Sequence, residues 1–327
     1  MTNQVVNRIF AKVDSNEFLT QQDAVALLKI DNQSTDFYRI ISKANELSRR
    51  EYRNKGYIFA QIGLNSAPCS GNCKFCSLAK DSFSIGSETY KGITDILAEA
   101  KTVIEQKADA LFLMTTADFS IEKFLQIGAE VKALMPEHMK LVANIGDFDL
   151  DTAKRLRATG FTSVYHIVRL NEGIDTDIPV QTRIHTLDAI KAVGLEVIYC
   201  VEPIGPEHTY EQIADEMLRA REYHVDVMAA MRRVCVEHTP LQDKGEITEL
   251  ELTKIVAVAR LVTRPKTSMN VHEPMKMPLL AGVNQLYAEI GINPRDNTLE
   301  TQNSRGFTIS NVAKMLKEAD YIADAFK

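Results

Sequence analysis

The sequence is poor in cysteine and has no long apolar run. Its five cysteines among 327 residues are a small, odd number that does not suit a disulfide-stabilised scaffold. No apolar stretch is long enough to cross a bilayer, and the N-terminal segment lacks the apolar core of a signal peptide. We therefore expect a cytoplasmic protein with reduced thiols and no membrane partner.

Positive charge is also in deficit. Lys and Arg number 38 against 44 Asp and Glu, a net charge of −6, so the composition gives no support to a nucleic-acid partner. Apolar residues make up 45% of the chain and charged residues 25%, which is the balance of a globular protein with a sizeable core. We see no repeat or linker, and expect a helical N-terminal extension over residues 1–50 and one barrel with a C-terminal helix over residues 51–327.

Short apolar runs alternate with amphipathic segments along most of the chain. Eight runs predict buried strands, at residues 56–65, 108–116, 140–146, 162–168, 195–203, 225–236, 266–273 and 284–291. Helical periodicity predicts helices at residues 93–107, 121–135, 150–160, 186–194, 210–223, 248–262 and 273–282. This alternation indicates a parallel sheet covered by helices, and eight strands suit a TIM-type (β/α)8 barrel. A partial barrel of six strands with a flanking extension is the alternative.

Three of the five cysteines fall inside eight residues of the segment SAPCSGNCKFCSL, as Cys69-x3-Cys73-x2-Cys76. They follow the first predicted strand, where such barrels place their chemistry. Three thiolates can hold three irons of a [4Fe–4S] cluster and leave the fourth iron for a small molecule. A structural zinc site would need a fourth ligand, and none lies in this loop. A redox dithiol would need only two of the cysteines.

This spacing, with Phe75 before the third cysteine, resembles the motif of the radical S-adenosylmethionine (SAM) superfamily. Residues 182–197, 202–209, 238–262 and 279–287 resemble biotin synthase and its relatives, which include methylornithine synthase, hydrogenase-maturation enzymes and split lipoyl synthases. The resemblance implies a [4Fe–4S] cluster that passes an electron to bound SAM and yields a 5′-deoxyadenosyl radical. A reductant such as ferredoxin or flavodoxin would supply the electron.

The same resemblance implies which residues bind SAM. Arg183 would pair with the methionine carboxylate, a task that suits the guanidinium fork, and Arg169 with Glu172 would meet the nucleotide. Asn144 would contact the ribose, and Thr115 would contact the methionine amino group. Ile204 and Gly205 would contact the adenine. The glycine-rich contact that many members make to the amino group is missing at Thr115.

The chain also departs from biotin synthase. At the strand positions that supply cysteines to the second cluster of that enzyme, this sequence has LFLMTT and VANIG, and Asn270 lies near the position of its arginine. Cys200 and Cys235 follow later, near the ends of two predicted strands. They would ligate an auxiliary iron–sulfur cluster or relay sulfur, unless each is simply a small buried side chain.

We therefore expect a radical SAM enzyme that inserts sulfur at an unactivated carbon, with Cys200 and Cys235 as its catalytic residues. The alternatives are a radical mutase or lyase of the methylornithine synthase or hydrogenase-maturation type, and a non-enzymatic iron–sulfur protein. Charged residues crowd the ends of the sixth and seventh predicted strands and favour a polar, carboxylated substrate. That substrate would be a free small molecule or would be bound to a carrier. An enzyme of the sulfur-inserting type would also need a partner radical SAM chain.

Overall fold

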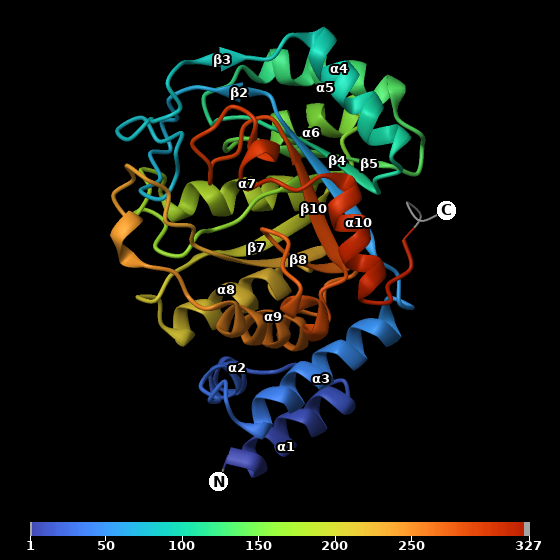
Figure 1. Cartoon of the computed structure of the whole chain (residues 1–327), viewed down its shortest axis with the longest axis vertical. Coiled ribbons are helices and arrows are strands. Elements are labelled where there is room, and N and C mark those ends of the chain that lie inside the picture. The colour runs from blue at the N-terminus through green and yellow to red at the C-terminus, as the bar shows by residue number, and fades with distance from the viewer. Residues whose placement is uncertain (1, 324–327) are drawn as a thin grey trace.

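Eight parallel strands close into a barrel in the computed structural model, which describes residues 2–323 (Figure 1). Each strand lies between its neighbours in the chain, and β1 closes the barrel against β10. The strands are β1 (Tyr57–Gly63), β4 (Ala110–Met114), β5 (Lys140–Asn144), β6 (Ser163–Tyr165), β7 (Glu196–Ile204), β8 (Val227–Arg232), β9 (Ser268–Val271) and β10 (Gln285–Ile290). The predicted (β/α)8 barrel is thus confirmed, and the six-strand alternative is wrong.

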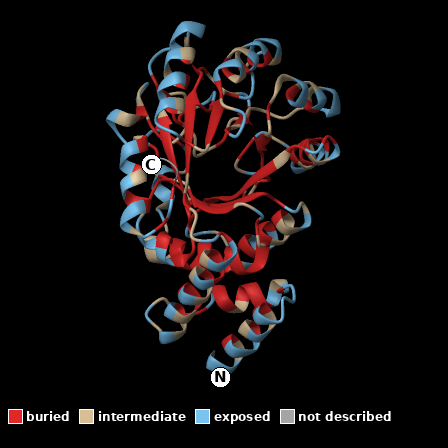
Figure 2. Ribbon diagram, turned by 90° about the vertical axis from the view of Figure 1, so that its right-hand side faces the viewer, coloured by how far each residue is buried: buried red, intermediate tan, exposed pale blue. Residues whose placement is uncertain are grey.

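Helices cover the outside of the barrel, with buried faces toward the strands and exposed faces outward (Figure 2). They are α4 (Ile93–Glu105), α5 (Ile121–Leu134), α6 (Leu150–Thr159), α7 (Val180–Ala192), α8 (Tyr210–Glu222), α9 (Glu249–Thr263) and α10 (Ile309–Glu318). Side chains of Ser120, Asp149 and Thr209 cap the first turns of α5, α6 and α8. Gly160, at φ 107°, ends α6 in the left-handed conformation typical of a capping glycine.

Three sequence-based boundaries need correction. Residues 273–282, predicted as a helix, contain only the 3-10 helix η2 (Met277–Ala281), because two prolines remove backbone donors from so short a segment. Helix α7 begins six residues before the predicted start, at Val180 after Pro179. Strand β8 ends at Arg232, so Cys235 lies in a loop rather than on the predicted strand 225–236.

The remaining short elements belong to the loops. They are a two-stranded antiparallel ribbon of β2 (Asn65–Ser66) and β3 (Thr89–Tyr90), and the 3-10 helices η1 (Gln242–Lys244) and η3 (Thr301–Asn303). The ribbon closes the base of the segment that carries the three clustered cysteines. None of the described helices has the length and apolar character needed to cross a bilayer.

The N-terminal helices α1 (Thr2–Asp14), α2 (Gln21–Leu28) and α3 (Thr35–Glu51) stack beneath α8 and α9 (Figure 1). Helix α9 is therefore enclosed on both sides, and its residues 252–263 are all buried. Arg260 of α9 donates from Nε to Ser48 Oγ of α3 at 2.9 Å, and its guanidinium lies 4.8 Å from the centre of the Tyr52 ring. One continuous set of buried apolar side chains runs from α1 through the barrel to Tyr321.

Candidate active site

The three clustered cysteines lie in the loop that follows β1, at the carboxyl end of the barrel. Within this loop the Cys69 N–H donates to Leu78 O at 2.8 Å, and the Cys76 N–H donates to Cys73 O at 3.0 Å. Asn72, between the first two cysteines, takes a left-handed conformation with φ 47°. The loop is thus folded back on itself by its own backbone.

Four other barrel loops hold this cysteine loop in place. The Lys74 N–H donates to Asp175 O, the Ser77 N–H donates to Pro294 O, and the Leu241 N–H donates to Lys74 O. The Ser70 backbone and hydroxyl both donate to the Asp118 carboxylate at 2.6 Å. Gly71 fits closely, since a Cβ there would meet Ile178 Cδ1 at 3.1 Å. Contacts from the loops after β4, β6, β8 and β10 therefore fix the positions of the thiols.

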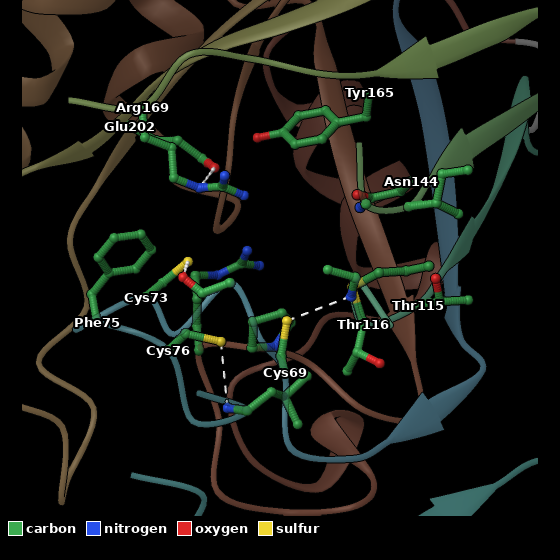
Figure 3. A pocket seen from close by; sticks show the side chains of 18 of the residues that line it. Cys69, Cys73, Phe75, Cys76, Thr115, Thr116, Asn144, Tyr165, Arg169 and Glu202 are labelled. Atoms are coloured by element: carbon green, nitrogen blue, oxygen red, sulfur yellow. Dashed lines mark hydrogen bonds and ion pairs between the residues drawn. The ribbon is translucent and has the colours of Figure 1, made fainter. Parts of the chain in front are cut away.

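The three thiols line one cavity at the mouth of the barrel (Figure 3). Burial raises the pKa of Cys73 to about 11, and burial together with the other two thiols raises that of Cys76 well above its usual value. Three thiolates this close together would repel one another, so their deprotonated state needs a bound cation. This donor set suits an iron–sulfur cluster and fits the predicted metal ligands Cys69, Cys73 and Cys76.

Polar side chains from the barrel strands, from the loops that follow them and from α7 line the rest of this cavity. Asn144 at the end of β5 donates to Gln61 Oε1 of β1 at 3.0 Å, and the Thr115 N–H donates to Asn144 O at 3.0 Å. The further polar wall residues are Tyr165, Arg169, Arg183, Glu202, His272, Tyr287, Glu289 and Arg295. The cavity therefore offers cations, carboxylates and hydroxyls to a bound molecule.

Two carboxylates bind the guanidinium of Arg183. Its Nη1 lies 3.1 Å from Asp147 Oδ2, and its Nε donates to Glu172 Oε2 at 3.2 Å. Glu172 is buried behind the cavity wall and also accepts from the Thr176 hydroxyl at 2.6 Å. Much of the hydrogen-bonding capacity of Arg183 is thus used inside the protein.

Arg169 is placed differently. Its guanidinium points into the cavity, with Nε 3.8 Å from Glu202 Oε1 and Nη1 3.7 Å from Glu172 Oε2 (Figure 3). Both distances exceed a hydrogen bond, and these two nitrogens find no hydrogen-bond partner in residues 2–323. Burial opposes its charge, but the nearby Cys73, Glu172 and Glu202 raise the pKa of Arg169 above its usual value. Arg169 is therefore a buried cation with free donors.

Comparison with known proteins places this geometry in a family. Biotin synthase of Clostridioides difficile (strain 630) is 26% identical over 261 residues, covering 77% of this chain and 79% of the relative. Biotin synthase of Carboxydothermus hydrogenoformans is 24% identical over 319 residues, covering 90% and 96%. No family model matches the chain. These similarities support a place for the chain in the radical SAM superfamily, in the biotin synthase-like branch.

Solved structures share the fold of this radical SAM protein. The crystal structure of methylornithine synthase (PylB) superimposes with a TM-score of 0.82 at 18% identity, covering 96% of this chain and 97% of that one. The hydrogenase maturase HydG from Carboxydothermus hydrogenoformans gives a TM-score of 0.80 at 14% identity, covering 99% and 81%. Membership in the superfamily implies a [4Fe–4S] cluster, SAM and a reductant.

The structure brings most of the predicted cofactor residues to the cavity. Thr115, Asn144, Arg169 and Arg183 line it, whereas Glu172 lies behind the wall and contacts Arg183. Ile204 and Gly205 lie instead in a separate hollow beside α8 and α9. A Cβ on Gly205 would collide with the guanidinium of the buried Arg233, so this glycine makes room for an arginine.

The two remaining cysteines lie in different surroundings. Cys200 is fully buried on β7, two residues before Glu202, and its side chain lies close to Glu202 and His272. Cys235 follows β8 in a partly exposed loop, where its N–H donates to Glu246 Oε1 at 3.1 Å, and it lies outside the residues that line the cavity. The adjacent-strand placement predicted for the pair is therefore wrong for Cys235.

Several wall residues were not singled out from the sequence. Strand alternation would have found some of them, because Gln61, Tyr287 and Glu289 are polar side chains on otherwise apolar strands. Arg295 could not be found in this way, since it lies in an irregular loop. It reaches Glu289 Oε1 with Nη2 at 2.6 Å.

Proposed function

We propose that this radical SAM enzyme rearranges or cleaves a small, polar, carboxylated substrate without inserting sulfur into it. The observation that carries the proposal is the composition of the cavity wall opposite the three thiols. It presents Arg169, Arg295, Glu202 and Glu289 beside two tyrosine hydroxyls. On the barrel strands the described structure has one thiol, Cys200, which is too few for a cysteine-ligated second cluster.

The cofactors fit the residues that are present. Cys69, Cys73 and Cys76 would hold the cluster, and the free N–H groups of Arg169 would bind the methionine carboxylate of SAM. When bound, the cluster and SAM supply a 5′-deoxyadenosyl radical that can take a hydrogen atom from an unactivated carbon. Asn144 and Thr115 line the same cavity and would orient the nucleoside.

The chain's own residues would then bind and orient the substrate. Arg295 is partly buried and ion-paired with Glu289, and its Nε has no hydrogen-bond partner among the described residues. That nitrogen can donate to a substrate carboxylate, while Glu202 can accept from an amino or hydroxyl group. The hydroxyl of Tyr165 points across the cavity toward Arg169 and Glu202 (Figure 3). The enclosed wall would keep water away from a reactive carbon.

Sulfur insertion, as in biotin synthase, is the second candidate. Cys200 favours it, because this thiol lies on a barrel strand beside two cavity residues, Glu202 and His272. In that case Cys200 would donate or relay sulfur, an auxiliary cluster would be needed, and a carrier-bound substrate or a partner radical SAM chain would take part. We place the enzyme in the cytoplasm, where reduced ferredoxin or flavodoxin can reach it.

Anaerobic reconstitution tests the proposal. We expect about four irons and four sulfides per chain, and reductive cleavage of SAM to 5′-deoxyadenosine. Replacing Cys73 with Ala should abolish both, while Cys235→Ala should lose neither iron nor SAM cleavage. Iron and sulfide both well above four per chain, and both falling in Cys200→Ala, would favour sulfur insertion instead. A chain that holds zinc at this loop, or does not cleave SAM, would refute both candidates.

A further inference from the structure

A second group of potential metal ligands lies inside the barrel, apart from the cysteine loop. The Cys200 sulfur, a Glu202 carboxylate oxygen and a His272 ring nitrogen all lie within 4.8 Å of one another. Cys200 is fully buried, Glu202 is 6% exposed, and the His272 side chain is 11% exposed. Three different donor types thus converge in a space that bulk water barely reaches.

Strand geometry explains the convergence. Cys200 and Glu202 are two residues apart on β7, so their side chains point to the same side of the sheet. Asn270 and His272 have the same spacing on and just after β9. Strand β8 lies between them, with Ala229 in register with both Cys200 and Asn270. A methyl group there leaves the space between the two polar pairs open.

The protein itself leaves His272 and Asn270 incompletely satisfied. His272 Nε2 is buried and lacks a hydrogen-bond partner in the described part of the chain, and so do both amide atoms of the fully buried Asn270. The Glu202 carboxylate contacts the Tyr165 hydroxyl and the Cys200 thiol, while Arg169 Nε and His272 Nδ1 lie 3.8 Å and 3.9 Å from it. Buried polar atoms left in this state are costly, which indicates that something else binds here.

We propose that Cys200, Glu202 and His272 bind a single divalent transition-metal ion, Zn²⁺ or Fe²⁺, whose open coordination position faces the cavity. Thiolate, imidazole and carboxylate form a mixed donor set typical of these ions. Ligand atoms around a tetrahedral zinc stand roughly 3.3–3.7 Å apart, so small side-chain rotations would bring the three donors to bonding distance. Thiolate and carboxylate together neutralise the ion, and the site would form whether or not the cysteine loop holds a cluster.

Two neighbouring aromatic rings fix the orientation of the His272 imidazole. The Tyr165 ring stacks on His272 with centroids 5.4 Å apart, and the Tyr287 ring meets it edge-on at 4.8 Å. Glu202 and His272 also line the main cavity, whereas Cys200 lies behind them. A metal ion here could therefore take a substrate oxygen or nitrogen as its fourth ligand.

Cobalt binding tests the proposal separately from the radical chemistry. The full-length chain with Cys69, Cys73 and Cys76 all replaced by Ser cannot bind a cluster, so Co²⁺ added to it anaerobically reports on the remaining thiols. We expect one Co²⁺ per chain and a thiolate-to-cobalt charge-transfer band. Cys200→Ser in this background should remove the band, and Glu202→Gln or His272→Gln should weaken Co²⁺ binding about tenfold or more. Cys235→Ser is the matched thiol control and should change neither.

Each other outcome overturns the proposal. Absence of Co²⁺ binding by the folded variant, or loss of the band in Cys235→Ser, would exclude this site. Thermal unfolding shows whether the variant without the three loop cysteines is folded. If it is not, the metal content of the unaltered chain tests the proposal instead. That chain, with its cluster reconstituted, should hold one extra zinc or iron that Cys200→Ser loses and Cys235→Ser keeps. If sulfide is lost together with iron, the site holds an auxiliary cluster rather than a single ion.

Discussion

Glu172 Oε2 accepts a hydrogen bond from Arg183 Nε at 3.2 Å and another from the Arg169 N–H at 2.9 Å. One buried carboxylate therefore contacts two of the arginines that line the cavity, but it leaves them in different states. Arg183 is held by Glu172 and Asp147, whereas the Arg169 guanidinium keeps free donors. On this basis we propose that Arg169 binds SAM and that Arg183 and Glu172 are positioning residues.

The two arginines should therefore respond differently to substitution. Arg169→Met should weaken SAM binding to the reconstituted protein roughly tenfold to a hundredfold, because charge-assisted hydrogen bonds contribute about 1.5–3 kcal/mol. Arg183→Met should mainly lower the unfolding temperature, because it leaves two carboxylates without their cation. Equilibrium binding of SAM and thermal unfolding, measured on both variants, check this. Loss of SAM affinity in Arg183→Met alone, with its stability intact, would restore the assignment made from the sequence.

Asp147 should make stability depend on acid pH. Burial acts to raise its pKa, but the contact with His166 and the charge of Arg183 prevail and hold the pKa at about 2. An unfolded Asp titrates at ~3.9, so the folded-state ionisation of Asp147 contributes about 2–3 kcal/mol well above that pH, which is lost as the pH falls toward 2. Asp147→Asn should lower the free energy of unfolding by about this amount at pH 6, by about half of it at pH 3 and by little at pH 2. Urea unfolding across this range measures it, and a pH-independent difference would indicate a packing effect instead.

The barrel could be predicted from the sequence because strands that are buried on both faces have a recognisable local composition. Each strand is an apolar run with little alternation, and the spacing between runs matches one helix. The cysteine loop could also be predicted from the sequence, since Cys69, Cys73 and Cys76 lie within one short segment. Helical periodicity gave a wrong prediction for residues 273–282, because prolines there remove backbone hydrogen-bond donors. This segment contains only a 3-10 helix.

The roles of the wall residues depend on pairings between distant segments. Arg183 and Arg169 look alike in sequence, and only the contact of Arg183 with Asp147, 36 residues earlier, separates them. Likewise nothing local distinguishes Cys200 from Cys235. The first is buried beside Glu202 and His272, while the second lies in a loop because β8 ends three residues before it.

Gly63, the last residue of β1, should be sensitive to any side chain. A Cβ there would collide with the backbone and side chain of Ile292, which packs with Leu78 and Met114 beside the cysteine loop. Gly63→Ala should destabilise the protein by about 1–3 kcal/mol and reduce its iron content after reconstitution. Gly92→Ala is the matched control, because a Cβ on Gly92 would meet only the flexible carboxylate of Asp95, at 3.5 Å. Equal stability and iron content in the two variants would contradict the prediction.

The N-terminal helices should be essential to the barrel although they lie far from the cavity. Ile40 of α3 is fully buried against the rest of the core, whereas Tyr38 of the same helix is 63% exposed. Ile40→Asp should cost about 3 kcal/mol or more, because it buries a charge without a partner, while Tyr38→Asp should stay within about 0.5 kcal/mol. Chemical denaturation of both variants checks this pair.

Removal of residues 1–50 is the stronger form of the same test. It would expose the apolar side of α9, whose residues 252–263 are all buried in the whole chain. We expect the truncated chain to aggregate on expression, because an uncovered apolar helix face favours association. If residues 51–327 instead remained monomeric and bound iron as the full chain does, the extension would be a separate unit resting on a self-sufficient barrel. The continuous set of buried side chains from α1 to Tyr321 argues for a single folding unit.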